Sequence, residues 1–546
     1  MKECRWVVLV MMTIIFIDIQ GKWRCDGCLE VERNALMQIK AFLNYPNGNF
    51  LSFWGFYTDC CNWNGVVCNT TTGRVTELHL GGIRYGWDSK DWYLNASLFL
   101  PFQELKHLDV FRNKIVGCIN NEGFERLSTL ENLELLNLGY NNFINNILSS
   151  FGGLLSLTTL YINENTLKGT LNVEDLNYLT KLKELHMEDN EIEGFKFLHG
   201  GEELLKLNNL EYLDLSLSSL KTLLISYNQL KGILNIEEFN CLISLQELRI
   251  QGNEIQGFKS LHGGEELLKL NNLEFLDLSV NHFDNNVFSF LKGLLSLKTL
   301  KIRHNQLEGS FKLKELDAWS KLQELDLSGN GIDEFVSSTT DFGGPSNMSI
   351  LYLEEINTSG RSNLIQSLKA FPHLKTLYLT NNNFTDDIFA EGFPILRNLQ
   401  HLHLDLSTLN NSFLQSIGTL TSLKTLSLTQ CGLTGTIPST QGLCELKHLK
   451  DLDISFNSLS GNLPWCLANL TSLQRLDISS NSFNGSISSS PLSSLTSINH
   501  LSLSYNKFQI PISLNPFVSL SNLTSFDCVG CEIYAETEVD DMTPNF

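Results

Sequence analysis

The sequence is poor in proline and in basic residues. Its 546 residues include 11 Pro, and 39 Lys and Arg stand against 60 Asp and Glu, for a formal net charge of −21. Nucleic-acid binding needs clustered Lys and Arg, so this balance argues against a nucleic-acid partner. Because 42% of the residues are hydrophobic, the chain can bury a large core, which excludes wholesale disorder.

Long apolar runs are also scarce. The one clear run, Trp6 to Ile17, follows two basic residues and precedes small residues at Gly21 and Gly27. It is shorter than the roughly 20 residues that a membrane-spanning helix needs. The segment 1–27 is therefore typical of a secretory signal peptide. We expect the chain to enter the secretory pathway, with no membrane span within these residues.

Motifs for catalysis are lacking as well. The sequence has no phosphate-cradling Gly loop, no kinase motif and no Gly-x-Ser-x-Gly element. Neighbouring acids such as Glu354 and Glu355 fall on turns or strands, with no pocket implied. The sequence thus predicts a protein that is not an enzyme and that carries no cofactor or metal.

Thirteen Cys residues suggest disulfides, because export places them in an oxidising compartment. Cys25-Asp-Gly-Cys28 has the spacing of a metal or redox pair, but no His pair accompanies it, so a structural role is favoured. Cys241, Cys431, Cys528 and Cys531 occupy repeat positions where we expect buried thiols.

Asn-x-Ser/Thr triplets occur throughout, and in an exported chain several are expected to carry glycans on solvent-facing Asn. The predicted acceptors are Asn69, Asn95, Asn347, Asn357, Asn383, Asn410, Asn469, Asn484 and Asn522.

From Val75 onward one pattern repeats, Leu-x-x-Leu-x-Leu-x-x-Asn, and it starts 19 times, mostly 24 to 28 residues apart. At this copy number the pattern indicates a leucine-rich-repeat solenoid. In Leu-x-Leu the side chains alternate faces as in a strand, so Leu residues point into the coil and the residues between them point outward. A single coil cannot bury its own apolar face, and neighbouring coils must stack.

The ninth repeat position is Asn in 13 of the 19 copies, for example Asn141, Asn305 and Asn481. An inward Asn can bond the backbone groups that are left free where the chain leaves the strand. Repetition predicts a ladder of such bonds, so these Asn residues are expected to be structural.

Part of the sequence is duplicated. Residues 198–211 read LHGGEELLKLNNLE, and residues 261–274 repeat this segment unchanged. After the first copy only ten residues separate the repeat starts Leu210 and Leu220, which is too few for a coil. We therefore expect an irregularity near 216–220.

The residues before the repeats suggest a cap. Leu29 to Leu43 has helical apolar spacing with acids in its first turn, and Cys60-Cys61-Asn62-Trp63-Asn64-Gly65-Val66-Val67-Cys68 follows. This cluster resembles the N-terminal cap of plant leucine-rich-repeat receptors. The resemblance implies the disulfides Cys28–Cys60 and Cys61–Cys68.

Later repeats strengthen the resemblance. Leu433-Thr-Gly-Thr-Ile-Pro438 and Leu463-Pro-Trp-Cys-Leu-Ala-Asn469 are similar to repeats of plant receptor-like proteins, which combine an extracellular repeat domain, a membrane span and a short tail without a kinase. Cys444 and Cys466 lie 22 residues apart at similar places in successive coils, so we expect a bridge between them. Many repeats lack the Gly-x-Ile-Pro element, and no Cys-bearing C-terminal cap or span follows the last repeat. The sequence thus reads as an extracellular domain truncated before the membrane span.

The predicted fold is an α/β solenoid: a curved leucine-rich-repeat arc with a parallel β-sheet on its concave face and a disulfide-braced N-terminal cap. The expected segments are a signal peptide at 1–27, the cap at 28–70, a solenoid of about 19 repeats at 71–534, and a truncated tail at 535–546.

The outward residues of the strands form the candidate binding face, because Arg and aromatic side chains concentrate binding energy at interfaces. The candidates are Phe111, Arg112, Tyr161, His186, Tyr227, Arg249, Arg303, His304, Tyr352, Tyr378, His401 and His403. His401, His403 and Asp405 share one strand face and could in principle bind a metal, but a solvated polar strand is the simpler interpretation.

The resemblance implies an extracellular receptor-like protein of the plasma membrane, with a role in plant defence. It would bind a peptide, glycan or protein on its concave face and signal through a partner receptor kinase. One alternative is a secreted protein similar to the polygalacturonase inhibitors, and another is a truncated, non-functional receptor copy.

Overall fold

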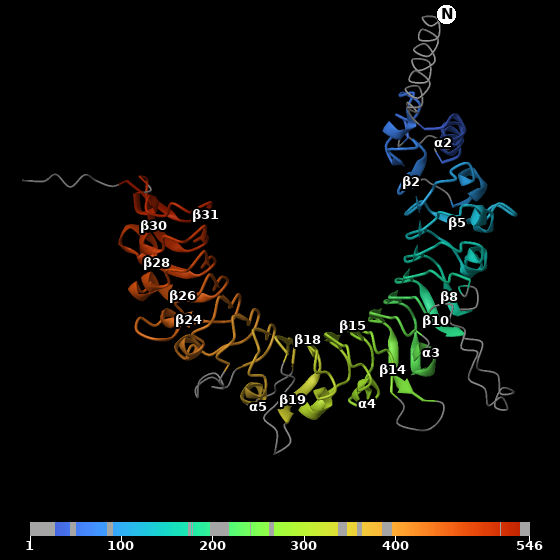
Figure 1. Cartoon of the computed structure of the whole chain (residues 1–546). Helices are drawn as coiled ribbons and strands as arrows, with labels where there is room; N and C mark the ends of the chain where they lie inside the picture. Colours follow the sequence, from blue (N-terminus) through green and yellow to red (C-terminus); the bar gives the residue numbers. More distant parts are fainter. Residues whose placement is uncertain are drawn as a thin grey trace, which may run out of the picture. The chain divides into compact units, whose positions relative to one another are not determined.

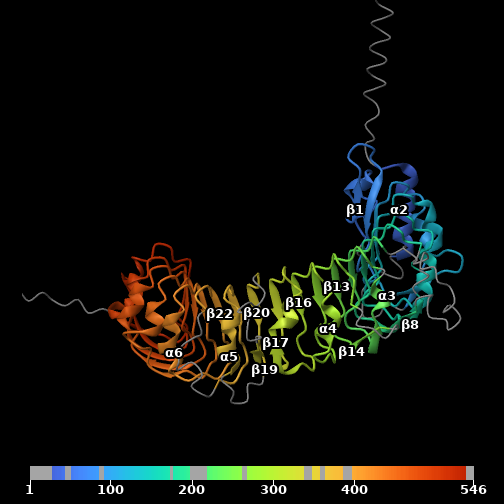
Figure 2. The same cartoon turned by 60° about the horizontal axis from the view of Figure 1, so that its bottom comes forward.

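A computed structural model gives the fold of the chain (Figures 1 and 2). The structure describes residues 28–43, 51–84, 91–172, 176, 178–196, 218–240, 242–260, 267–336, 347–356, 363–384, 396–513 and 515–535. The predicted signal peptide, Cys241, Asn357 and residues 536–546 of the predicted tail lie outside the described residues. The chain divides into two compact units, Met1–Ile255 with Lys259–Leu261, and Gln256–Phe258 with His262–Phe546.

The first unit contains a ladder of short strands with one strand for each repeat. The ladder begins with β1 (Val66–Cys68), which pairs antiparallel with β2 (Val75–His79). The parallel strands that follow are β4 (His107–Asp109), β6 (Leu135–Asn137), β7 (Thr159–Tyr161), β9 (Glu184–His186), β11 (Thr222–Leu224) and β13 (Glu247–Arg249).

The second unit contains the same kind of parallel ladder. Its strands are β15 (Phe275–Asp277), β16 (Thr299–Lys301), β18 (Glu324–Asp326), β20 (Ile350–Tyr352), β21 (Thr376–Tyr378), β22 (His401–His403), β23 (Thr425–Ser427), β25 (Asp451–Asp453), β27 (Arg475–Asp477), β29 (His500–Ser502) and β31 (Ser525–Asp527). Within this unit the ladder lies on the inner side of the curve, and α4 (Val287–Leu291) and α5 (Asn363–Ser367) lie on the outer side (Figure 1).

Further short strands follow the ladder strands in many repeats. In the first unit these are β3 (Trp92–Leu94), β5 (Ile115–Cys118), β8 (Lys168–Asn172), β10 (Glu191–Lys196) and β12 (Lys231–Asn235), with β14 (Glu254–Lys259) at the boundary. In the second unit they are β17 (Glu308–Lys312), β19 (Gly331–Val336), β24 (Thr434–Gly435), β26 (Ser458–Gly461), β28 (Ser482–Ser486), β30 (Lys507–Pro511) and β32 (Glu532–Tyr534). The last five of these strands form one parallel sheet.

Little of the chain that connects the ladder strands is α-helical. Besides α4 and α5, the described α-helices are α2 (Glu30–Leu43), α3 (Glu237–Asn240) and α6 (Phe413–Ser416). The 3-10 helices are η1 (Cys60–Asn62), η2 (Ala96–Phe99), η3 (Phe124–Thr129), η4 (Asn145–Phe151), η7 (Leu313–Leu316), η8 (Leu368–Ala370), η9 (Ile417–Thr419), η10 (Gly442–Glu445), η11 (Trp465–Asn469), η12 (Ile487–Ser489), η13 (Pro491–Ser494) and η14 (Asn515–Phe517). Figure 2 shows the turns of the second unit beside α4, α5 and α6.

The core is the stack of inward Leu side chains, as the alternation predicts. In β16, Leu300 is fully buried while its neighbours Thr299 and Lys301 are half-buried. The same pattern of one buried residue between two half-buried ones recurs in β7, β9, β20, β21 and β22. The predicted leucine-rich-repeat solenoid with a parallel sheet is therefore confirmed.

The predicted Asn ladder is also confirmed. The Asn141 side chain, which is 4% exposed, donates from Nδ2 to the carbonyl of Leu138 at 2.9 Å and to that of Val110, one repeat earlier, at 3.1 Å. Its Oδ1 accepts the backbone N–H groups of Asn113 and Ile115. Each such Asn thereby satisfies backbone groups of two coils that would otherwise be buried without a partner.

The cap joins the ladder through α2. Ala35, Leu36, Ile39 and Leu43 are buried on one side of this helix. Glu32 is fully buried beside them, and its carboxylate accepts a hydrogen bond from Arg74 Nε at 2.9 Å and one from the backbone N–H of Val75 at 3.1 Å. The sequence pattern places Glu32 only in the first helical turn, so its burial is a finding of the structure.

The ladder has an irregular junction between β9 and β11. β9 pairs directly and in parallel with β11, Leu185 lying opposite Leu223. The irregularity that the sequence predicts near 216–220 falls at this junction, where the repeat starts Leu210 and Leu220 are only ten residues apart. Leu210 itself lies outside the described residues.

Four disulfides are present among the described residues. Cys28–Cys60 and Cys61–Cys68 brace the cap with the partners that the resemblance implies, and Cys444 pairs with Cys466 as expected from their spacing. The fourth, Cys528–Cys531, corrects the expectation of two buried thiols, because the turn after β31 brings their Cα atoms to 5.6 Å.

Candidate functional site

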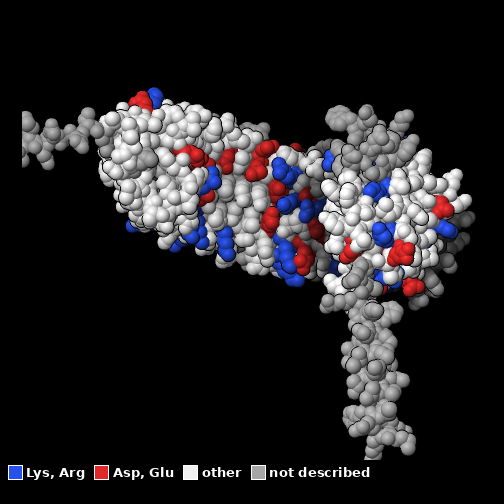
Figure 3. All heavy atoms as spheres, turned by 90° about the horizontal axis from the view of Figure 1, so that it is seen from above, with Lys and Arg blue, Asp and Glu red and all other residues white. Residues whose placement is uncertain are grey.

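The outward side chains of the ladder form a continuous face on each unit, here called the inner face. It consists of the third, fifth and seventh positions of each repeat, counted from the first Leu, because the fourth and sixth positions are buried. Seen onto the second unit, acidic and basic side chains intermix over its first repeats and become sparse toward its C-terminal end (Figure 3). The inner face therefore differs in character along its length.

The structure divides the twelve candidate residues into two groups. Tyr161, His186, Arg249, Tyr352, Tyr378, His401 and His403 lie on strands of the ladder, and Phe111 and Arg303 follow their strands by two residues. Arg112, Tyr227 and His304 instead occupy the eighth repeat position, at the turn, with φ values of 50° to 55°. The expectation that these three lie on strands is wrong, because the chain must turn there to place the ninth residue inside the coil.

Three of the candidates in the second unit form one aromatic stack. The rings of Tyr352 and Tyr378 lie 4.4 Å apart with an interplanar angle of 3°, and the ring of His403 lies 4.5 Å from that of Tyr378 at 10°. The register Tyr352–Tyr378–His403 along β20, β21 and β22 produces this stack. Face-to-face packing leaves ring edges and polar tips for a ligand.

Acidic groups surround this stack. Burial and then the charge of Glu324 raise the pKa of the Tyr352 hydroxyl, so it remains a neutral donor at physiological pH. Burial, followed by the charge of Asp326, raises the pKa of Glu354. Burial lowers the pKa of His403, so its imidazole is held neutral, with a free nitrogen as a possible acceptor.

Basic side chains lie on the repeat of β16, two rungs before the first ring of the stack. Arg303 Nη2 lies 3.2 Å from His304 Nε2, and His304 lies 3.7 Å from Glu355. Lys301 lies 3.6 Å from Glu324 and 5.7 Å from the ring of Phe275. Sequence reasoning missed Lys301, although its fifth repeat position matches that of Tyr352 and Tyr378.

The first unit holds a second aromatic pair. The rings of Tyr161 and His186 stack at 4.2 Å, and His186 Nδ1 lies 3.5 Å from Glu188. The buried atoms His186 Nε2 and Glu188 Oε2 have no hydrogen-bond partner among the described residues. Burial and then the charge of Glu164 raise the pKa of nearby Asp189. This part of the face is therefore acidic, with two unpartnered polar atoms buried beneath it.

Phe111 also has an aromatic partner that sequence reasoning missed. Its ring lies 4.7 Å from that of Tyr140, which occupies the eighth position of the next repeat. The repetition of aromatic residues at this position was the available signal.

The side chains of His401, His403 and Asp405 are engaged separately. His401 Nδ1 lies 2.9 Å from Thr425 Oγ1, and Asp405 Oδ1 accepts from Thr429 N–H at 2.9 Å, while His403 belongs to the stack. Among the described residues no group of three or more His, Cys, Asp or Glu side chains is placed to hold a metal ion.

Two described Cys residues are free thiols. Burial raises the pKa of Cys118 and of Cys431 to about 12, so neither is a ready nucleophile. The Cys431 thiol occupies the Asn position and donates to the carbonyl of Leu404 at 3.1 Å. It therefore acts as a substitute for the ladder amide.

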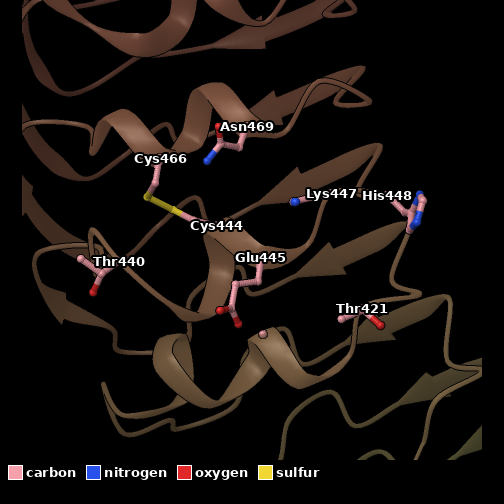
Figure 4. Close-up of a pocket in the computed structure, with 9 residues that line it drawn as sticks. Thr421, Thr440, Cys444, Glu445, Lys447, His448, Cys466 and Asn469 are labelled. Atoms are coloured by element: carbon pink, nitrogen blue, oxygen red, sulfur yellow. A yellow bond between two sulfur atoms is a disulfide. The ribbon is translucent and has the colours of Figure 1, made fainter.

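A hollow of about 590 Å³ lies beside the Cys444–Cys466 disulfide, away from the ladder strands (Figure 4). Its walls include Glu445, His448 and Asn469. Asn469 is also a predicted glycan acceptor and is exposed, so a sugar there would stand at the edge of this hollow.

The other predicted glycan acceptors face solvent to different degrees. Asn69 and Asn95 are half-buried, and Asn347, Asn383, Asn410, Asn484 and Asn522 are exposed. Their modification stays a prediction.

Comparison with known proteins places these features in a family. Residues 355–544 match the model of a leucine-rich repeat region, and residues 29–69 match that of a leucine-rich-repeat N-terminal domain. Cuscuta receptor 1 of Solanum lycopersicum is 32% identical over 478 residues, which cover 86% of this chain and 36% of that protein. The chain is a leucine-rich-repeat protein that is similar to the plant leucine-rich-repeat receptor-like proteins.

Other comparisons agree with this assignment. Receptor like protein 21 of Arabidopsis thaliana is 33% identical over 39% of this chain. A leucine-rich-repeat protein of Leptospira interrogans has a solved structure with a TM-score of 0.56 and 24% identity, covering 82% of this chain and 95% of its own, and it supports the fold alone. The chain spans 36% and 22% of the lengths of the two plant relatives. None of the described helices combines the length and apolarity needed to cross a membrane.

Proposed function

We propose that this receptor-like chain is a ligand-recognition module that works outside the cell, at the plasma membrane. The aromatic stack of Tyr352, Tyr378 and His403 carries the proposal, because it presents adaptable polar tips on a rigid ladder. The names of the relatives, Cuscuta receptor 1 among them, support a receptor role. The four disulfides favour an oxidising, extracytoplasmic compartment.

The ligand that suits this face is a peptide or a peptide segment of a protein, and a glycan is a further candidate. The polar tips of the stack lie among carboxylates such as Glu354, with Arg303 and Lys301 nearby. Such a mixture of donors, acceptors and charges matches a peptide chain better than a purely apolar molecule. We further propose that a partner receptor kinase passes on the binding event.

Thermal stabilisation of the purified, secreted chain tests the proposal. Apoplastic peptide fractions that contain the ligand should raise the melting temperature of the wild type, because a ligand that binds only the folded state stabilises it. The double variant Tyr352→Ala/Tyr378→Ala should lose this shift. The matched control is Trp465→Ala, since Trp465 is 64% exposed in η11 and lies off the inner face.

Two results would count against this function. One is an equal shift in the wild type and the double variant. The other is inhibition of a secreted polygalacturonase by the chain with no response to any peptide fraction, which would favour the secreted-inhibitor alternative.

A further inference from the structure

The eighth repeat position forms a column of its own along the C-terminal repeats of the second unit. The backbone N–H of Leu406 donates to the carbonyl of Thr429, that of Phe456 to Ser479, and that of Tyr505 to Val529, at 2.7 to 3.0 Å. On the rungs between these, the backbone N–H of Gln430 donates to the carbonyl of Ser455 at 3.1 Å, and that of Ser480 donates to the carbonyl of Ser504 at 2.8 Å. These five residues therefore stand in one line, one on each successive rung.

Large apolar side chains occupy every second place in this column. Leu406 is 50% exposed, Phe456 is 60% exposed and Tyr505 is 65% exposed. These three residues are called the apolar row below. Isolated exposed apolar side chains are ordinary, but the regular spacing of these three presents a repeating apolar surface that a partner with the same repeat can contact.

The backbone makes this choice of residues costly. The φ values of Leu406, Phe456 and Tyr505 are 60°, 53° and 56°, in the left-handed region that favours Gly or Asn. The equivalent residues Gly329 and Asn381 in earlier repeats of the same unit show that small or polar residues fit the position. The fold therefore does not require bulky apolar residues at these three places.

Acidic side chains lie on the rungs that carry this column, and they are called the acidic row below. Asp405 shares the rung of Leu406 and Asp453 shares that of Phe456, whereas Asp477 lies on the rung of Ser480. Oδ1 of Asp453 accepts from the backbone and hydroxyl of Ser455, and Oδ1 of Asp477 does the same with Ser479. Among the described residues, Oδ2 of Asp453 and of Asp477 receives no hydrogen bond, and neither carboxylate has an ion-pair partner. These oxygens remain for a cationic ligand.

The spacing of the apolar row favours one backbone conformation of a bound peptide. Adjacent strands lie about 4.8 Å apart, so every second rung recurs after about 9.6 Å. A polyproline II chain has three residues per turn and rises about 3.1 Å per residue, so its side chains return to one face after about 9.3 Å. A fully extended β-strand repeats its face after about 6.7 Å and does not match.

We propose that the apolar and acidic rows together bind a basic peptide segment in polyproline II conformation, with an apolar side chain at every third residue. The segment runs along the ladder, so that three apolar side chains contact Leu406, Phe456 and Tyr505 while Arg or Lys side chains between them pair with Asp453 and Asp477. This proposal rests on the proposed recognition function and names the chemical class of its ligand.

The test uses the secreted chain and a labelled synthetic peptide of sequence LPRLPRL, measured by fluorescence anisotropy. We expect saturable binding that weakens as salt rises, because the ion pairs lie at the surface. The acidic peptide LPELPEL and the spacing control LLPRPRL should bind at least tenfold more weakly. Phe456→Ser/Tyr505→Ser should weaken LPRLPRL binding at least tenfold, and Asp453→Asn/Asp477→Asn should weaken it and reduce its salt dependence.

Val280→Ser is the matched control. Val280 has the same repeat position in the same unit and is 44% exposed, but lies outside the row. It should bind LPRLPRL like the wild type. Equal binding of the three peptides, no saturable binding of LPRLPRL, or unchanged binding by the Phe456→Ser/Tyr505→Ser variant would overturn the proposal. The apoplastic thermal-shift assay separates the two ideas, because a shift that needs Tyr352 and Tyr378 but not Phe456 supports the general function alone.

Discussion

Glu32 of the cap helix and Arg74 at the start of the repeats are joined by an ion pair of 2.9 Å whose carboxylate is completely buried. The second carboxylate oxygen binds the backbone N–H of Val75, the first residue of β2. One side chain therefore fixes the cap on the first rung.

We expect Glu32→Ala to destabilise the first unit by about 3 kcal/mol or more, because removing one partner of a buried pair leaves the other groups without compensation. Glu32→Gln should cost less, since it keeps an acceptor for Val75. Chemical denaturation of the secreted chain measures both changes, with the exposed Glu30→Ala as control. Equal stability of the Ala variant and the wild type would contradict this coupling.

The Asn ladder makes a residue-level prediction at Asn330. Its Nδ2 donates to the carbonyls of Ile302 and Leu327, and its Oδ1 accepts from the N–H groups of Asn305 and Leu307. Asn330→Ala should cost about 1–3 kcal/mol. Hydrogen exchange at Asn305 and Leu307 should accelerate selectively. Asn330→Cys should lose less stability, because the thiol of Cys431 already donates one such bond.

The alternation in β16 predicts unequal effects for two adjacent residues. Leu300→Ala should cost about 2–5 kcal/mol, because it leaves a cavity in the core. Lys301→Ala should cost less than about 1 kcal/mol, because a partly exposed ion pair contributes little. Denaturant midpoints of the two variants test the facing of the strand, and a reversed order would show that it is wrong.

The stability of the second unit should depend on the protonation of His403. Its folded-state pKa is lowered by burial and by His401, against the opposing charges of Asp405 and Asp451. The unfolded state therefore takes up the proton first, and this contribution to stability is complete above pH about 6.5 and is lost as pH falls through the lower, folded pKa. His403→Gln should flatten the stability profile below pH about 6.5. An NMR titration with a His403 midpoint above about 6.5 would refute the prediction.

Most of the fold was predictable because every repeat has the same pattern of inward Leu, outward residues and an inward ninth residue. Leu300 and Asn141 can be placed from their repeat positions alone. The reach of Glu32 across to Arg74 could not, since it depends on how the cap docks. The repeat positions of Cys528 and Cys531 predict buried thiols because such positions normally face the core, whereas the turn after β31 brings the two residues together.

The candidate site was predicted less completely. The strand positions of Tyr352, Tyr378 and His403 followed from the pattern, and their stacking followed from the register. The eighth position was misread as strand at Tyr227 and His304, because a period of two does not reveal where the chain turns into the left-handed region. The sequence therefore predicted the inner face but not the turn at the eighth repeat position, where the strand residues end.

The direct pairing of β9 with β11 has a consequence for how such a protein changes over generations. Each rung contacts only its immediate neighbours. When one coil is lost or gained, the flanking coils therefore pair with their new neighbours, and the inward leucines keep their buried positions. What such an event alters is the adjacency of the surface: side chains that were separated by a coil come about 4.8 Å closer to one another. Recombination between similar coils can thus produce a new combination of surface chemistry in a single step, without a substitution.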